Sequence, residues 1–150
     1  MHYKTSFLMR NFLLLLLFAV AFTACKKDSD PEPQQVAGNY EVTRLAFDTD
    51  GTADDFDLTL PITQGSNSIS GSLVATNVSG KPNAVTMRLT LRVTGQQPDE
   101  TDLGEIELRQ TGNTFELYQD NVKLGTADGR NINIDVAEQG TRLIIVARKV

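Results

Sequence analysis

The sequence has very few of the residues on which most catalytic and metal-binding sites depend. Its 150 residues include one histidine, one cysteine and no tryptophan. The histidine is His2, and the cysteine, Cys25, directly follows a leucine-rich run. After Cys25 the sequence therefore offers no Ser-His-Asp or Cys-His catalytic group, no histidine or cysteine ligand for zinc, no disulfide and no haem histidine. We expect a non-enzymatic protein that carries no cofactor.

Long hydrophobic runs are also scarce, and the longest lies at the amino terminus. Phe12–Ala24 holds 13 uncharged residues, fewer than the roughly 20 that a membrane-spanning helix needs. Lys4 and Arg10 precede it, which is the charge pattern of an export signal. We therefore predict a signal peptide over residues 1–24. The alternative is a buried amino-terminal helix, which the charged residues directly after Cys25 disfavour.

The end of this run resembles the lipobox of bacterial lipoproteins. Phe22-Thr23-Ala24 places small residues directly before Cys25, although the family prefers leucine where Phe22 stands. The resemblance implies cleavage before Cys25, acylation of its sulfur and a stable membrane anchor, because two or more acyl chains hold firmly. The following Lys26-Lys27-Asp28 is similar to the tether of lipoproteins in the Bacteroidota. This similarity implies the cell outer membrane, with the protein facing the periplasm or the cell surface.

A polar tether separates this anchor from the rest of the chain. Residues 25–35 hold two prolines and, after Cys25, no apolar side chain, so they cannot bury enough surface to fold. Residues 36–150 remain as a single domain. Removal of the signal peptide takes away its only charged residues, Lys4 and Arg10, so the net charge falls by two from −5 to −7. Such an acidic chain does not suit nucleic acid, which needs a positive field.

The domain alternates between apolar and polar residues with the period of a β-strand. The alternating segments are Phe56–Ile62, Ser68–Ala75, Val85–Thr94, Glu105–Arg109, Phe115–Leu117, Val122–Leu124 and Asn131–Val136. Asp120-Asn121 and Asp128-Gly129 are candidate two-residue hairpin turns, and Asp48–Asp55 and Gly95–Asp102 are longer loops. We predict an all-β fold, an antiparallel meander of about eight or nine strands. The meander closes into a barrel or, as the alternative, folds into a two-sheet sandwich.

The two ends of the domain resemble those of lipocalin-like barrels. That family begins with a Gly-x-Trp element on its first strand, and an arginine of the last strand packs on the aromatic ring. Gly38-x-Tyr40 stands at one end of the domain, with tyrosine in place of tryptophan, and Arg142 and Arg148 stand near the other. The resemblance implies a closed barrel whose interior can hold a small hydrophobic ligand.

The expected interior residues follow from the alternation. They are mostly aliphatic, and one charged side chain is added because the apolar pattern changes phase between Val42 and Leu45, which indicates a bulge that turns Arg44 inward. The residues expected to face a ligand are Tyr40, Arg44, Leu60, Met87 and Leu89.

One segment has the composition of a cation site. Calcium prefers several oxygen ligands on a loop that turns sharply, often at a glycine. Here the candidate ligands Asp48, Asp50, Asp54 and Asp55 bracket Gly51. The segment lacks the glutamate that closes an EF-hand loop, so a solvated turn is the alternative interpretation.

Two functions of different classes remain open. The first is a membrane-tethered carrier that holds a small hydrophobic ligand inside the barrel. The second is a structural or interaction module with a solid β core, which recognises protein partners through its loops or its acidic face. Neither is catalytic. Glu105 and Glu107 are spaced to share one face of a strand, but we expect that face to be solvated rather than to form a glycosidase pair.

Overall fold

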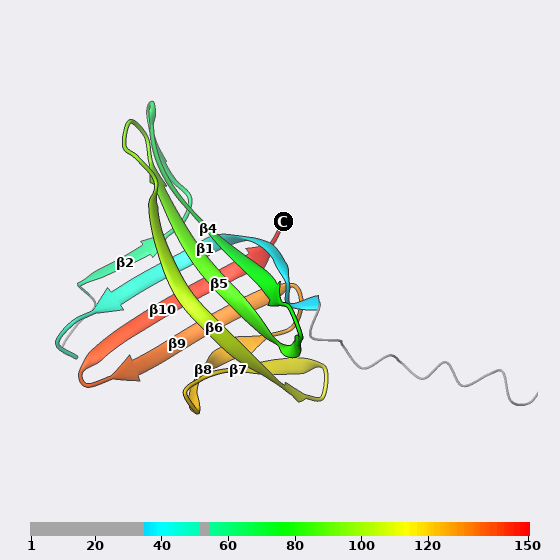
Figure 1. The fold of residues 1–150 in the computed structure, drawn as a ribbon. Helices are drawn as coiled ribbons and strands as arrows, with labels where there is room; N and C mark the ends of the chain where they lie inside the picture. The colour runs from blue at the N-terminus through cyan, green and yellow to red at the C-terminus, as the bar shows by residue number, and fades with distance from the viewer. Residues whose placement is uncertain (1–34, 52–54) are drawn as a thin grey trace, which may run out of the picture. The chain divides into compact units, whose positions relative to one another are not determined.

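The computed structural model describes residues 35–51 and 55–150, so the signal peptide, Cys25 and nearly all of the tether lie outside the described residues. The described chain forms ten β-strands joined by turns, which confirms the all-β prediction (Figure 1). The strands are β1 (Gly38–Asp48), β2 (Phe56–Thr59), β3 (Ile62–Gln64), β4 (Asn67–Val78), β5 (Lys81–Val93), β6 (Asp99–Thr111), β7 (Thr114–Gln119), β8 (Val122–Ala127), β9 (Asn131–Glu138) and β10 (Thr141–Lys149).

Eight of these strands close into an antiparallel barrel. They follow the order β1-β10-β9-β8-β7-β6-β5-β4, and β4 pairs with β1 to complete the ring. The first part of β1, Gly38–Val42, pairs with β4, while nearly its whole length pairs with β10 on the other side. This closure satisfies backbone groups that an open meander exposes at its edges. The barrel prediction is confirmed and the sandwich alternative is wrong.

The two short strands β2 and β3 lie in a fork between β1 and β4. Beyond Val42, β1 pairs with β2 in place of β4, while the start of β4 pairs with β3. Leu60 lies at the fork, where its amide donates to the Thr43 carbonyl over 2.9 Å. The sequence pattern predicts one strand across Phe56–Ile62, but the structure divides it at Pro61, after a cis peptide bond. It is divided because its two halves pair with different neighbours.

The two ends of the barrel differ. We name the end where β1 begins the closed end, and the end where β1 finishes the open end. Toward the open end β8 pairs with β9 only through Gly125–Ala127, and β6 pairs with β7 only from Glu107 onward. The sheet therefore divides at the open end into two flaps, one of β2, β1, β10 and β9 and one of β3, β4, β5 and β6 (Figure 1).

The observed connections between strands match the predicted turns and loops in part. Asp120-Asn121 forms the predicted two-residue turn, with positive φ angles of 49° and 64°. The predicted turn at Asp128-Gly129 is three residues long, because the Asp128 carboxylate accepts the amides of the next two residues after Gly129. The predicted loop Gly95–Asp102 is shorter, since β6 already begins at Asp99.

The inside of the barrel is filled with apolar side chains from all eight strands. One continuous core extends from the closed end toward the open end. Its largest fully buried members are Tyr40, Phe115, Leu73, Met87, Ile106, Leu117, Ile132 and Ile145. Each such side chain contributes about 1.5–3 kcal/mol by leaving water. Among the described residues no side-chain nitrogen or oxygen that is completely inaccessible to solvent lacks a hydrogen-bond partner, so the core holds no unsatisfied polar atom.

Candidate functional site

Four of the five predicted interior residues lie inside the barrel. Tyr40, Leu60, Met87 and Leu89 come from β1, the fork and β5, and all belong to the buried core. Their placement confirms that the alternation identified the inner face. In this structure they pack against other core side chains.

Arg44 points outward, so its predicted interior position is wrong. The predicted bulge is present, as a register shift between Val42 and Arg44. Its extra residue returns Leu45 to the inner face, while the Arg44 guanidinium donates to both oxygens of Asp57 over 2.9 and 2.7 Å. This contact lowers the pKa of Asp57. If the guanidinium pointed inward, it would lose its hydration, and no carboxylate partner would compensate for that loss.

The closed end is sealed around Tyr40. The ring is 1% exposed, and its hydroxyl donates to the carbonyl of Val36, itself fully buried, over 2.6 Å. Burial, together with the charge of Asp128, raises the pKa of Tyr40 to about 12. The chain therefore enters the barrel through a packed, hydrogen-bonded segment.

The cation that accompanies Tyr40 is Lys149. Its Nζ lies 5.6 Å from the ring centroid and donates to the carbonyls of Gln35 and Ala37, each over 2.9 Å. The lipocalin resemblance suggested Arg142 or Arg148 for this place beside the Tyr40 ring. Both side chains lie on the outer face of the barrel instead. Arg148 contacts Glu41, and Arg142 pairs with Asp135.

Two of the four aspartates of the predicted cation site, Asp48 and Asp55, accept hydrogen bonds within their own loop. Asp48 accepts the backbone amides of Asp50 and of the glycine that follows it, and Asp55 accepts both the amide and the hydroxyl of Thr49. Asp54 lies outside the described residues. Within residues 35–51 and 55–150 no three acidic, histidine or cysteine side chains gather as metal ligands. Calcium binding here stays a prediction.

Glu105 and Glu107 share the outer face of β6, as expected. Each carboxylate is paired with a cation: Glu105 with Lys81 at 2.7 Å, and Glu107 with Arg109 at 2.9 Å. The hydrogen bond from Arg109 lowers the pKa of Glu107. Both carboxylates are exposed and held in surface ion pairs, which contribute little to stability.

A hollow of about 570 Å³ opens on the inner face at the open end. We name it the mouth hollow; it is lined by Phe47, Val136, Glu138, Gln139, Thr141 and Leu143. Val136 and Leu143 pack against the core, so the apolar inner surface continues into the hollow. Phe56 of β2 stacks on Phe47 with ring centroids 6.0 Å apart and is itself 39% exposed. This surface can accept an apolar group.

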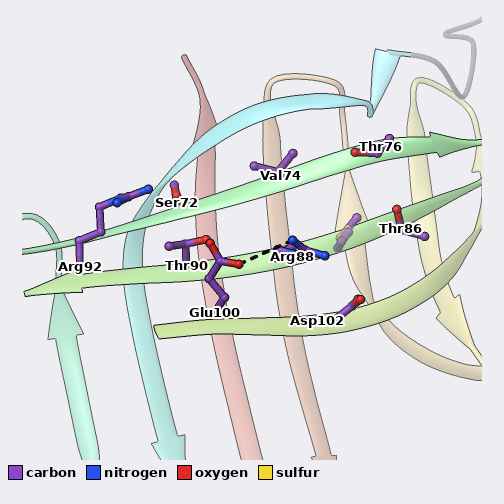
Figure 2. Close-up of a pocket in the computed structure, with 10 residues that line it drawn as sticks. Ser72, Val74, Thr76, Thr86, Arg88, Thr90, Arg92, Glu100 and Asp102 are labelled. Carbon is purple, nitrogen blue, oxygen red and sulfur yellow. Dashed lines mark ion pairs between the residues drawn. The ribbon is translucent and has the colours of Figure 1, made fainter. Parts of the chain in front are cut away.

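A second hollow, of about 520 Å³, lies on the outer face of β4, β5 and β6 (Figure 2). We name it the outer hollow. Its lining is mainly polar: Ser72, Val74 and Thr76 from β4, Thr86, Met87, Arg88, Thr90 and Arg92 from β5, and Glu100 and Asp102 from β6. Thr90 is only 6% exposed although it faces outward, so it forms part of the floor.

Sequence reasoning missed the acidic wall of the outer hollow. The segment Asp99–Asp102 has no apolar residue and therefore predicts a loop, whereas the structure pairs it with Arg88–Leu91 of β5. The available signal was the length of the alternating β5 segment, which needs a neighbouring strand along its whole extent.

Among the residues that the structure describes, we find no helical segment with the length and hydropathy of a membrane span.

No protein-family model matches the chain, and no curated protein sequence matches it either.

Proposed function

We propose that this chain is a non-enzymatic, lipid-anchored protein of the bacterial cell envelope whose barrel acts as an interaction module. The observation that supports an interaction module over a carrier is the filled interior. Tyr40, Leu60, Met87 and Leu89 are between 1% and 7% exposed. An eight-stranded barrel can either be filled by side chains or hold one small ligand, and packed side chains favour the first.

The place where the chain enters the barrel separates the tethered end from the open end. The described chain begins at Gln35 beside the closed end, where Lys149 binds its carbonyl. If Cys25 is acylated, the ten residues that follow it can span at most about 35 Å. The open end, with Phe47, Phe56 and Leu143, is then the end of the barrel to which the chain is not tethered. An apolar surface in that position is accessible to a partner protein.

Cys25→Ala tests the anchor. We expect this variant to move from the membrane fraction to the soluble fraction and to lose the mass of its acyl chains, because the tether that remains is polar. Fractionation and intact-mass spectrometry measure both effects. Ser29→Ala, in the same tether, is the matched control and should stay with the membrane. A Cys25→Ala protein that remains membrane-bound would refute lipidation as the anchor.

The mouth hollow favours a second candidate function, the binding of a small apolar ligand. Its apolar floor, formed by Phe47, Val136 and Leu143, is continuous with the core. A fluorescent hydrophobic probe should bind the wild-type chain, and Leu143→Lys should weaken that binding at least about tenfold by introducing a charge that loses its hydration.

Val150→Lys is the control for this experiment. Val150 is 82% exposed at the closed end, where its amide donates to Asn39, so its substitution should leave probe binding unchanged. Melting curves establish that both variants fold. Equal probe binding by the folded Leu143→Lys variant would eliminate the mouth hollow as the binding site.

A further inference from the structure

The outer hollow has the size of a ligand site and the lining of a polar one. Its volume of about 520 Å³ falls in the range of roughly 300–1,000 Å³ that small-molecule sites occupy. Most such sites are lined by apolar and aromatic side chains, whereas this one presents hydroxyl, guanidinium and carboxylate groups (Figure 2). A molecule that fits it therefore has to be rich in polar groups.

The arginines of the outer hollow are paired much less closely than three other arginines of the barrel. Arg44, Arg109 and Arg142 each hold one carboxylate with two short hydrogen bonds, all between 2.7 and 3.0 Å. Arg88 contacts Glu100 only at 3.6 Å, and Arg92 forms no ion pair with any described residue. The hollow thus retains guanidinium donors in a planar arrangement that suits a carboxylate.

Hydroxyl groups lie on both sides of Arg88, and one pair of them lies between Arg88 and Arg92. Ser72 and Thr90 face each other across the β4–β5 pair, and Thr76 faces Thr86 in the same way. In the described part of the chain these four hydroxyls have no side-chain hydrogen bond to the protein. In Figure 2 the Arg92 side chain extends toward Ser72. Donors and acceptors therefore stand next to the Arg92 guanidinium, which forms no ion pair with the described residues, and they remain open to a ligand.

A bulge in β6 holds the acidic wall. The register shifts between Met87 and Arg88, where Gly104 adopts a φ of +80°. Asp102 accepts the Gly104 amide over 2.8 Å, and the Gln119 side chain donates to the Leu103 carbonyl over 2.9 Å. Bulges bend a strand and redirect its side chains. This one is fixed from both sides, and it keeps the β6 wall, including Glu100, beside the floor of the hollow.

We propose that the outer hollow binds an acidic sugar, that is, a pyranose unit bearing a carboxylate. Arg92 pairs with the sugar carboxylate, Glu100 and Asp102 accept hydrogen bonds from ring hydroxyls, and Ser72 and Thr90 contact the remaining oxygens. A neutral sugar leaves Arg92 without a partner. A simple anion binds only weakly, because the two carboxylates of the hollow cancel the positive charge of its two arginines. This site is separate from the interaction surface proposed above and does not depend on the anchor.

Titration calorimetry on the detergent-solubilised full chain tests the proposal. The probes are glucuronate and galacturonate as acidic sugars, glucose as a neutral sugar, acetate as a simple anion and glycine as a zwitterion. We expect saturable binding of at least one acidic sugar with a millimolar or lower Kd, and binding of glucose, acetate and glycine at least about tenfold weaker. Acetate or glycine binding as tight as the acidic sugars would overturn the sugar assignment, and so would no saturable binding of either acidic sugar.

Variants locate the binding in the outer hollow. Arg92→Gln should reduce the affinity for the acidic sugar at least about tenfold, since a charge-assisted pair is lost. Arg92→Lys should fall between this variant and the wild type, because it keeps the charge but not the planar fork. Arg130→Gln, the same change at an exposed arginine of the β8–β9 connection, should bind like the wild type. Unchanged affinity in Arg92→Gln would place the sugar elsewhere and refute the proposal.

Discussion

Replacing Gly125 by alanine is expected to lower the free energy of unfolding by at least about 3 kcal/mol. Gly125 lies on β8 opposite Ile134 of β9. A Cβ at this position overlaps the Asn133 carbonyl oxygen and lies 2.9 Å from both the Asn133 carbonyl carbon and the Ile134 Cα. These are backbone atoms, so no side-chain rotation relieves the contact. The strands have to separate.

Separating β8 from β9 costs much free energy, because only a short stretch of paired residues holds these two strands together. β8 and β9 are held together by three residue pairs, the fewest between any two neighbouring strands of the eight-stranded ring. Loss of these pairs opens the barrel and exposes the core next to Ile132 and Ile134, both buried. Thermal and urea unfolding measure the effect, and we expect the Tm to fall by about 10 °C or more.

Gly65→Ala is the matched control. Gly65 lies in the β3–β4 turn, where nothing stands within 4 Å of an added Cβ and φ is +63°. Its substitution carries only the left-handed penalty of about 1 kcal/mol. If Gly125→Ala is no less stable than Gly65→Ala, the close approach of β8 and β9 is not what requires glycine at position 125.

The fold could be predicted wherever alternation and turn chemistry act locally. Val85–Val93 alternates without interruption and forms the inner and outer faces of β5 as expected. Asp120-Asn121 adopts the predicted turn because both residues tolerate positive φ. Pro61 was less predictable: the alternating pattern runs through it, but which neighbour each half pairs with depends on where β1 and β4 diverge. That divergence is a property of the closed sheet and leaves no local signal.

The candidate sites were also predictable only in part, because some side-chain positions depend on the closed sheet and leave no local signal in the sequence. A bulge beside Arg44 was evident from the phase change, but a phase change does not say which residue is extra, and so the side of the guanidinium stayed undetermined. The inward position of Lys149, in contrast, could have been predicted from the alternation along the last strand. It shares the parity of Leu143, Ile145 and Ala147, all inward, whereas Arg148 has the opposite parity. Period-2 counting from the last strand identifies the lysine without the structure.

Tyr40→Ala is the second substitution for which we expect a large effect. The ring is 1% exposed at the closed end, its hydroxyl bonds to Val36, and the Lys149 ammonium lies 5.6 Å from its centroid. Truncation of a buried aromatic leaves a cavity that the rigid strand ends cannot refill, so we expect a loss of about 4 kcal/mol in the free energy of unfolding. A loss below about 1 kcal/mol would mean that the ring does not seal the barrel.

Tyr40→Phe separates the hydroxyl from the ring, and pH supplies the test. This variant keeps the packing and should lose about 1–2 kcal/mol at neutral pH, because the Val36 carbonyl loses its donor. Since the folded pKa is raised from 10.0 to about 12, the neutral hydroxyl stabilises the fold fully below pH 10. That stabilisation, on the order of 2 kcal/mol, is lost as the pH rises from 10 toward 12. Wild type and Tyr40→Phe should therefore converge in stability over this range, whereas a gap that stays constant from pH 8 to pH 12 would show that burial does not hold the tyrosine neutral.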